Sequence, residues 1–321
     1  MSHHTPKLSI CLPVFNGQRY LALAIESILG QSFADFELVI VDNASTDQTE
    51  SIARDYARRD RRVRFHRNER NLGAAPNFNR AYHLSSGPLV RWASYDDLWT
   101  RDAMKLCIER LERDPSIICC HGRTQVIDEQ GAPVPTYDRA AGPPPGPGHI
   151  PEDRLYDPAD RVLDADRPSQ RLSELLLRTH WCYEIFGVIR RSVLERTTLH
   201  GSFYGSDKVL LAELLLAGKI VNVPETVFLR RDHQGNSTSL RTHSERADWM
   251  DTSLGGRIRR PHLRLLKGYA GAIRRAQIPA REKLACWRVL LAWMLQFRKL
   301  GQVVYESDSE SPVPQAVSAH S

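Results

Sequence analysis

Short apolar runs alternate with segments of helical spacing through about the first 120 residues of this 321-residue chain. The apolar runs have the length of buried strands, and the segments between them repeat apolar residues three and four positions apart, as a helix does. Strands that alternate with helices of this length predict right-handed crossovers and a mostly parallel sheet flanked by helices, an α/β fold of the Rossmann-like kind. The expected strands span residues 8–14, 36–41, 63–66, 89–93 and 117–120.

The second half of the chain is less regular. A run rich in proline and glycine at residues 140–151 predicts a loop, because neither a helix nor a central strand tolerates that composition. Beyond it we expect helices at 170–177 and 208–217 and strands at 185–189, 220–223 and 226–230. We therefore divide the chain into an α/β lobe (1–125), a loop region (126–169), a second lobe of the same domain (170–240), a basic helical extension (241–301) and a disordered end (302–321).

Composition limits the cellular setting and the partners. The net charge of +6 favours anionic partners, such as nucleotides, lipid diphosphates, anionic membranes or nucleic acid. The six cysteines form no CxxC pair, which predicts buried free thiols in a reducing compartment. The N-terminal residues lack the apolar core of a signal peptide, and no apolar run approaches the ~20 residues that span a bilayer. We therefore expect a cytoplasmic protein.

Polar residues follow three of the expected strands at the point where each strand ends. Because ligands of an open parallel sheet bind at the carboxyl ends of its strands, these residues predict one binding crevice. An acid there can accept a hydrogen bond from a base, an aromatic ring can stack on it, and two adjacent carboxylates favour a hard cation such as Mg²⁺ or Mn²⁺. The residues are Pro13, Phe15 and Asn16 after the first strand, Asp42 and Asn43 after the second, and Ser94, Asp96 and Asp97 after the fourth.

Five motifs in this region carry a resemblance. They are LPVFNG at 12–17, SILGQSF at 27–33, FELVIVDNASTD at 36–47, RNLG at 70–73 and SYDD at 94–97. In this order and spacing they resemble glycosyltransferase family 2, an inverting family with a GT-A fold. The resemblance implies transfer of a sugar from a nucleotide diphosphate sugar, with UDP or dTDP expected, to a hydroxyl of a glycan or lipid-linked acceptor.

The resemblance also assigns roles around the nucleotide. It places Pro13 and Phe15 in the loop that contacts the base, with Asn16 beside them, and it makes Asp42 the acid that reads the base. Many members have a second aspartate where Asn43 stands. The remaining matches, which border the nucleotide, are Asn71, Gly73 and Asn77.

A divalent cation is the implied cofactor. The family motif commonly reads Asp-x-Asp-Asp, and Ser94 replaces its first acid here. Asp96 then holds the metal-ligating position, with Asp97 beside it, and His233 is a candidate to complete the metal shell. Arg230 and Arg231, in the loop that carries His233, could compensate the charge that develops on the leaving diphosphate.

An inverting transfer needs a base that removes the proton of the acceptor hydroxyl. Asp207, in the segment YGSDKVLLAEL, matches the catalytic aspartate that the resemblance implies. The alternative for Asp207 is an N-cap of a helix that starts at Lys208.

Three alternatives remain open from the sequence. A nucleotidyltransferase that makes sugar nucleotides would also use a parallel sheet and a carboxylate-bound metal, although LPVFNG lacks its Gly-rich signature. The basic helical extension could bind nucleic acid, but it has no groove-reading motif, so we expect that the protein binds no nucleic acid. The extension could instead make peripheral contact with an anionic membrane or pack on the catalytic lobe.

Overall fold

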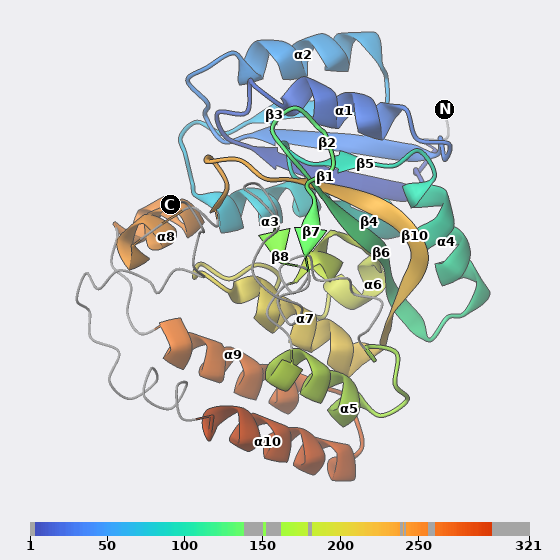
Figure 1. Ribbon diagram of the computed structural model, residues 1–321, viewed down its shortest axis with the longest axis vertical. Coiled ribbons are helices and arrows are strands. Elements are labelled where there is room, and N and C mark those ends of the chain that lie inside the picture. The colour runs from blue at the N-terminus through green and yellow to red at the C-terminus, as the bar shows by residue number, and fades with distance from the viewer. Residues whose placement is uncertain are drawn as a thin grey trace.

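The computed structural model describes residues 4–137, 150–151, 162–178, 182–237, 240, 242–255 and 261–296. Most of the Pro/Gly-rich run and the whole of the expected disordered end lie outside the described residues. Within them the chain forms one eight-stranded sheet with helices on both faces (Figure 1). None of the described helices is long and apolar enough to cross a bilayer.

The sheet has the strand order β3-β2-β1-β4-β9-β6-β10-β5. It is mixed and mostly parallel at its N-terminal side, where β1 pairs in parallel with β2 and β4, and β2 with β3. The strands are β1 (Leu8–Val14), β2 (Phe36–Asp42), β3 (Val63–Arg67), β4 (Leu89–Trp92), β5 (Leu98–Trp99), β6 (Ile117–Ile127), β9 (Val188–Arg190) and β10 (Lys219–Arg231), while β7 (Thr136–Tyr137) and β8 (Ile150–Pro151) form a separate two-stranded sheet.

Two strand predictions in the second half need correction. The strand expected at 185–189 is a 3₁₀ turn, Tyr183–Phe186, followed by the short β9, which pairs antiparallel with β4 and β6. The strands expected at 220–223 and 226–230 are one strand, β10, whose register with β6 shifts between Val223 and Thr226. Pro224 lies at this shift, and its missing N–H prevents a regular ladder there.

Alternation along the strands divides the core into two apolar layers. Leu8, Ile10 and Leu12 of β1 pack on one face of the sheet and Cys11 on the other. The first face is covered by α1 (Leu21–Leu29), α2 (Thr49–Arg59) and α4 (Ala103–Arg113). The second face is covered by α3 (Ala74–Leu84) and α7 (Ser206–Ala217).

Helix α7 lies between the sheet and a further helical layer (Figure 1). Its residues from Val209 to Leu216 are all buried, so it shows no polar face, as expected for a helix enclosed on all sides. Within the basic helical extension, α9 (Pro261–Arg275) packs on α7, and α10 (Ala280–Met294) packs on α9 and on α5 (Pro168–Ser173). The helices not yet given are α6 (Arg191–Leu194) and α8 (His243–Met250).

Candidate active site

The loop after β1 is fastened to the loop after β2. The backbone N–H of Asn16 donates to Oγ of Ser45 at 2.8 Å, and Oδ1 of Asn16 accepts from the N–H of Thr46 at 2.9 Å. Asn16 and Ala44 have positive φ angles of 50° and 61°, conformations that cost energy and gather at functional sites. Phe15 follows β1 with 39% of its surface exposed, so its ring is accessible for stacking on a base.

Asp42 ends β2 with a fully buried side chain. Its carboxylate accepts a hydrogen bond from the N–H of Ser45 at 3.0 Å and forms an ion pair with Arg67 at the end of β3. Pro13 lies opposite Val41 in the β1–β2 pair and is also buried. Asp42 would have to exchange Arg67 for a base N–H in order to read a nucleotide, and that role stays a prediction.

Four asparagines form a cluster of amides behind this loop. Oδ1 of Asn43 accepts from Nδ2 of Asn68 at 2.7 Å, and Nδ2 of Asn43 donates to Oδ1 of Asn71 at 2.8 Å. Nδ2 of Asn68 also donates to Oδ1 of Asn77, at 2.9 Å. Asn43 and Asn77 are buried, so they hold the 68–73 loop against the end of β2 through hydrogen bonds inside the protein.

Gly73 lies where the 68–73 loop meets the C-terminal part of the chain. Its φ of 90° and ψ of 170° belong to a region that only glycine adopts readily. A Cβ atom at this position would lie 2.5 Å from Cα of Asp251, which follows α8. The N–H of Thr252 donates to the carbonyl of Leu72, at 3.3 Å. This close backbone contact seats the end of α8 beside the loop.

Asp96 and His233 come together from two segments that are far apart in the sequence. Nε2 of His233 lies 3.0 Å from Oδ2 of Asp96, and Ser94 donates its hydroxyl to Oδ1 of Asp96. Nδ1 of His233 accepts from the N–H of Gly235 at 3.1 Å, which places the ring proton on Nε2, toward Asp96. The predicted metal residues Asp96 and His233 are thus neighbours.

Asp97 points into a different environment. Its side chain is buried, and Oδ1 accepts a hydrogen bond from the backbone N–H of Arg231 at 2.8 Å. Burial and the charge of Asp96 raise the pKa of the Asp97 carboxyl. Asp97 therefore anchors the end of β10, and Asp96 is the carboxylate with an oxygen beside His233.

The two arginines of this loop differ in what they contact. The guanidinium of Arg231 is buried and donates to the carbonyls of Asp96, Asp128 and Glu129, at 3.0, 2.9 and 3.0 Å. Most of its N–H groups are therefore used inside the protein. Arg230 lies 3.7 Å from the carboxylate of Asp232, and both arginines line one cavity.

Asp207 lies in the first turn of α7. That helix begins at Ser206, after Gly205 with a φ of 88°, and no side chain caps it, so the alternative that Asp207 is an N-cap is wrong. Burial raises the pKa of the Asp207 carboxyl, while the charge of Lys208 and backbone hydrogen bonds oppose that rise only in part. A carboxylate with a raised pKa is a stronger base.

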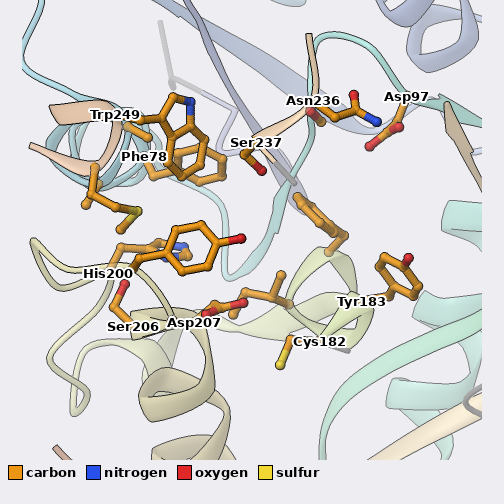
Figure 2. A pocket seen from close by; sticks show the side chains of 18 of the residues that line it. Phe78, Asp97, Cys182, Tyr183, His200, Ser206, Asp207, Asn236, Ser237 and Trp249 are labelled. Carbon is orange, nitrogen blue, oxygen red and sulfur yellow. The ribbon is translucent and has the colours of Figure 1, made fainter. Parts of the chain in front are cut away.

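A cavity of about 320 Å³ brings these groups together. Its lining includes Asp96, Asp97, Arg230, Asn236 and Asp207. In Figure 2, Asp97 and Asn236 lie on one side of the view, and His200 and Ser206 lie on the other. Asp207 lies between these two pairs. Predicted residues from both halves of the chain thus share one cavity.

Sequence reasoning missed several residues of this cavity. They are single residues from separate helices and loops, so no spacing or motif indicated them. They include an aromatic group that encloses the space near Asp207: Phe78, His200, Tyr204 and Trp249. Trp249, on α8, keeps 40% of its surface exposed.

The residues present fit a divalent cation that is shared with a diphosphate. Among the described residues there is no cluster of three or more histidine, cysteine or acidic side chains that could hold a metal alone. Asp96 offers one oxygen, and His233 would offer Nε2 once the ring proton moves to Nδ1 and the hydrogen bond from Gly235 is released. Phosphate oxygens and water would supply the other ligands.

A family model described as glycosyl transferase family 2 matches residues 9–196, more than half of the chain. The chain belongs to glycosyl transferase family 2. The matched range includes the strand-end residues of the site and ends before Asp207 and His233.

Family 2 relatives cover only part of the chain. The chain is 30% identical over 162 residues to the putative teichuronic acid biosynthesis glycosyltransferase TuaG of Bacillus subtilis. The aligned region covers 50% of this chain and 59% of TuaG. The chain is 26% identical over 211 residues to the GalNAc(5)-diNAcBac-PP-undecaprenol beta-1,3-glucosyltransferase of Campylobacter jejuni, covering 65% of this chain and 60% of that enzyme. The chain therefore spans less than two thirds of the length of these family 2 relatives.

Solved structures share the fold of this family 2 chain. S. aureus TarS 1-349 in complex with UDP-GlcNAc has a TM-score of 0.59 and 15% identity, covering 93% of this chain and 79% of that one. The mannosyltransferase PcManGT of Pyrobaculum calidifontis, in complex with GDP-Man and Mn²⁺, has a TM-score of 0.58 and 18% identity. The match covers 94% of this chain and 74% of PcManGT. The α/β, GT-A-like architecture expected from the sequence, with its C-terminal helices, is confirmed.

Proposed function

We propose that this family 2 protein is an inverting glycosyltransferase that moves a sugar from a nucleotide diphosphate sugar to an acceptor hydroxyl. One observation carries the proposal. Asp207, a carboxylate whose pKa is raised by burial, lines the same cavity as Asp96 and Arg230. A base at one part of a cavity and diphosphate-binding groups at another are what direct displacement at an anomeric carbon requires.

Asp207 is the general base in this mechanism. Its carboxylate accepts the proton of the acceptor hydroxyl while that oxygen attacks the anomeric carbon. The bond to the diphosphate breaks on the opposite face, so the configuration at the anomeric carbon inverts. Glu213, another acid of α7, hydrogen-bonds to the N–H of Thr198 and pairs with Arg275, so its carboxylate is already used elsewhere.

The leaving diphosphate lies at the other part of the cavity. Asp96 and His233 would hold a divalent cation there, and this cation would neutralise charge that develops on the diphosphate. Arg230 supplies a further positive charge, and the N–H groups of a guanidinium suit phosphate oxygens. Asp97 keeps the loop in place through its bond to Arg231.

The nucleotide lies along the ends of β1 and β2 in this proposal. Phe15 stacks on the base, Asp42 reads it, and the 68–73 loop borders it; UDP and dTDP are the expected carriers. A thermal-shift screen of uridine, deoxythymidine and guanosine diphosphates, with Mn²⁺ or EDTA, tests this directly, because a specific ligand raises the melting temperature by mass action. We expect a uridine or deoxythymidine diphosphate to stabilise the protein with Mn²⁺. Absence of a shift with every nucleotide would contradict the proposal.

The two other functions have less support. A nucleotidyltransferase would need cationic groups for a triphosphate after β1, where the chain has Phe15 and Asn16. Nucleic acid binding by the helical extension would need basic side chains with groove-reading or stacking partners. The exposed face of α10 is instead mainly apolar, which favours a different partner.

The acceptor is a glycan or a lipid-linked sugar, and α10 offers a surface for an anionic membrane. Four large apolar side chains, spaced three and four positions apart, form a stripe on its outer face. Basic residues flank this stripe, and the only acid of the helix, Glu282, is buried on the opposite face. Such a helix lies flat at the headgroup level of an anionic membrane. The stripe consists of Leu284, Trp287, Leu291 and Leu295, and its basic flanks of Arg281, Lys283 and Arg288.

This surface gives the proposed location. The enzyme would work in the cytoplasm, at the inner face of the cell membrane. Nucleotide sugars reach it from solution, and a lipid-linked acceptor reaches it from the bilayer. The exposed fractions of the stripe, 55% at Leu284, 38% at Trp287, 54% at Leu291 and 59% at Leu295, are high for large apolar side chains of a helix.

A further inference from the structure

Two buried polar atoms of the cavity have no hydrogen-bond partner among the described residues: Nε2 of His200 and Oγ of Ser206. Both residues line the cavity, and Figure 2 shows them beside Asp207, away from Asp97. A buried polar group without a partner lowers the free energy of unfolding, because it has lost its hydrogen bonds to water and gained none in the protein. Native proteins keep few such groups, and a pair in one cavity points to a ligand that supplies the missing partners.

The surroundings hold the imidazole of His200 in one place. Its ring packs edge-on against Trp92 and Phe78, with centroid distances of 4.8 and 5.0 Å. Asn79 binds its backbone on both sides, donating to the carbonyl of His200 at 2.8 Å and accepting from its N–H at 3.0 Å. The ring is therefore positioned before any ligand arrives, which lowers the entropy lost on binding.

The chemistry of the pair suits a hydroxyl group. Burial lowers the pKa of His200 to about 4, so the imidazole is neutral at physiological pH and brings no charge to the cavity. A neutral imidazole and a serine hydroxyl can each donate or accept, as a sugar hydroxyl does. Phe78, Tyr204 and Trp249 add aromatic faces to the same cavity, and these suit the C–H face of a pyranose ring.

We propose that Nε2 of His200 and Oγ of Ser206 form a binding subsite for a hydroxyl of a pyranose ring, which they hold beside Asp207. The inference rests on the proposed glycosyl transfer. The ring belongs either to the transferred sugar of the donor or to the acceptor. Both present the same hydroxyl chemistry, and the experiment separates them.

The variants His200→Phe and Ser206→Ala test the subsite. Each removes a polar atom that has no partner, and phenylalanine fits the aromatic surroundings of His200. A purely structural role predicts no kinetic change. The subsite predicts an unchanged or higher melting temperature together with about a tenfold loss of affinity for the sugar, the effect of about 1.4 kcal/mol of lost hydrogen bonding. His200→Gln keeps a hydrogen-bond donor and an acceptor, so it should restore part of the affinity for the sugar. The same variant tests the subsite if His200→Phe fails to fold.

Thr124→Val is the matched control. Oγ1 of Thr124, on β6, is another buried hydroxyl that lacks a partner in the described part of the chain, but Thr124 does not line this cavity. We expect this variant to match Ser206→Ala in melting temperature and wild type in every kinetic measurement. Equal kinetic losses in Thr124→Val and Ser206→Ala would contradict the subsite.

The measurements assign the ring. Calorimetry with UDP and with UDP-N-acetylglucosamine or UDP-glucose separates the nucleotide from the sugar; weaker binding of the UDP-sugar alone assigns the subsite to the donor. Transfer to a panel of glycosides, compared with hydrolysis of the same donor, assigns it to the acceptor if only transfer falls. Unchanged values in both arms would overturn the inference. Failure of the proposed function looks different, because wild type itself would then neither bind the nucleotides nor transfer a sugar.

Discussion

Nε2 of His233 lies 3.0 Å from Oδ2 of Asp96, although 137 positions separate the two residues. Asp96 follows β4, whereas His233 follows β10, and the sheet brings the two strand ends to one edge. Hydrogen bonds fix both groups: Ser94 donates to Asp96, and Gly235 donates to Nδ1 of His233. The pair is therefore arranged before a cation or diphosphate binds.

Removal of either member of this pair should abolish metal-dependent nucleotide binding. In Asp96→Ala or His233→Ala we expect the affinity for Mn²⁺, measured by calorimetry in the presence of UDP, to fall by about a hundredfold or more. Asp102→Asn is the control, because Asp102 is an exposed carboxylate that does not line the cavity. Equal Mn²⁺ affinity in wild type and in the Asp96 variant would show that the cation site lies elsewhere.

Gly73→Ala should loosen the contact between the 68–73 loop and the end of α8. The new methyl group would meet Cα of Asp251 at 2.5 Å, in a backbone conformation that alanine adopts poorly. We expect a loss of about 3 kcal/mol in unfolding free energy, measured by urea denaturation, and faster hydrogen exchange near Trp249.

The control for this variant is Gly255→Ala. Gly255 also has a positive φ, 55°, but a Cβ atom there would have no neighbour within 4 Å among the described residues. It should therefore show only the smaller cost of the backbone conformation, about 1 kcal/mol. Equal losses in the two variants would mean that the contact with Asp251 contributes little.

The stripe of α10 should bind anionic vesicles. Leu291→Asp places a negative charge at its centre, so sedimentation with phosphatidylglycerol vesicles should fall by at least about tenfold and binding by wild type should weaken steeply with salt. Leu23→Asp, at an exposed leucine of α1 outside the stripe, should bind as wild type does. Equal binding of the vesicles by wild type and by Leu291→Asp would show that the stripe of α10 is not the membrane-binding surface.

The sequence predicted the N-terminal half of the sheet closely. The expected strand 8–14 coincides with β1, because its residues are buried on both faces of a parallel sheet and so form an unbroken apolar run. The three-residue β9 could not be placed, since it has no period of its own and is held by β4 and β6. Pairing with strands that lie far away in the chain decided its position.

Part of the candidate site could be located from the sequence. Asp96, Asp97 and Asp207 line one cavity, and the strand end and helix start near them are visible in the pattern, while their roles stay predictions. His200 and Ser206 gave no signal, because their role depends on which atoms lack a partner after folding. The ion pair of Asp42 with Arg67 was equally invisible, because it joins the last residues of β2 and β3, which become neighbours only when the two strands pair.

The raised pKa of Asp207 predicts a pH dependence. Burial favours the protonated form of Asp207, so above the folded-state pKa the ionised carboxylate lowers the free energy of unfolding. This loss shrinks as the pH falls below the folded-state pKa, and it vanishes below 3.8, the ordinary pKa of the group. Asp207→Asn should therefore be as stable as wild type or more so at neutral pH, and the difference in melting temperature should shrink on acidification. A difference that does not change with pH would show that Asp207 does not titrate in this window.

The rate of sugar transfer by Asp207→Asn tests the account most directly. Asparagine keeps the size of the side chain but cannot accept the acceptor proton, so kcat should fall by about a hundred- to ten-thousand-fold. The affinity for the donor nucleotide should stay within about twofold of wild type, because that site is formed by other residues. This combination is what a general base predicts. Turnover within a few-fold of wild type would contradict it and would place the base elsewhere.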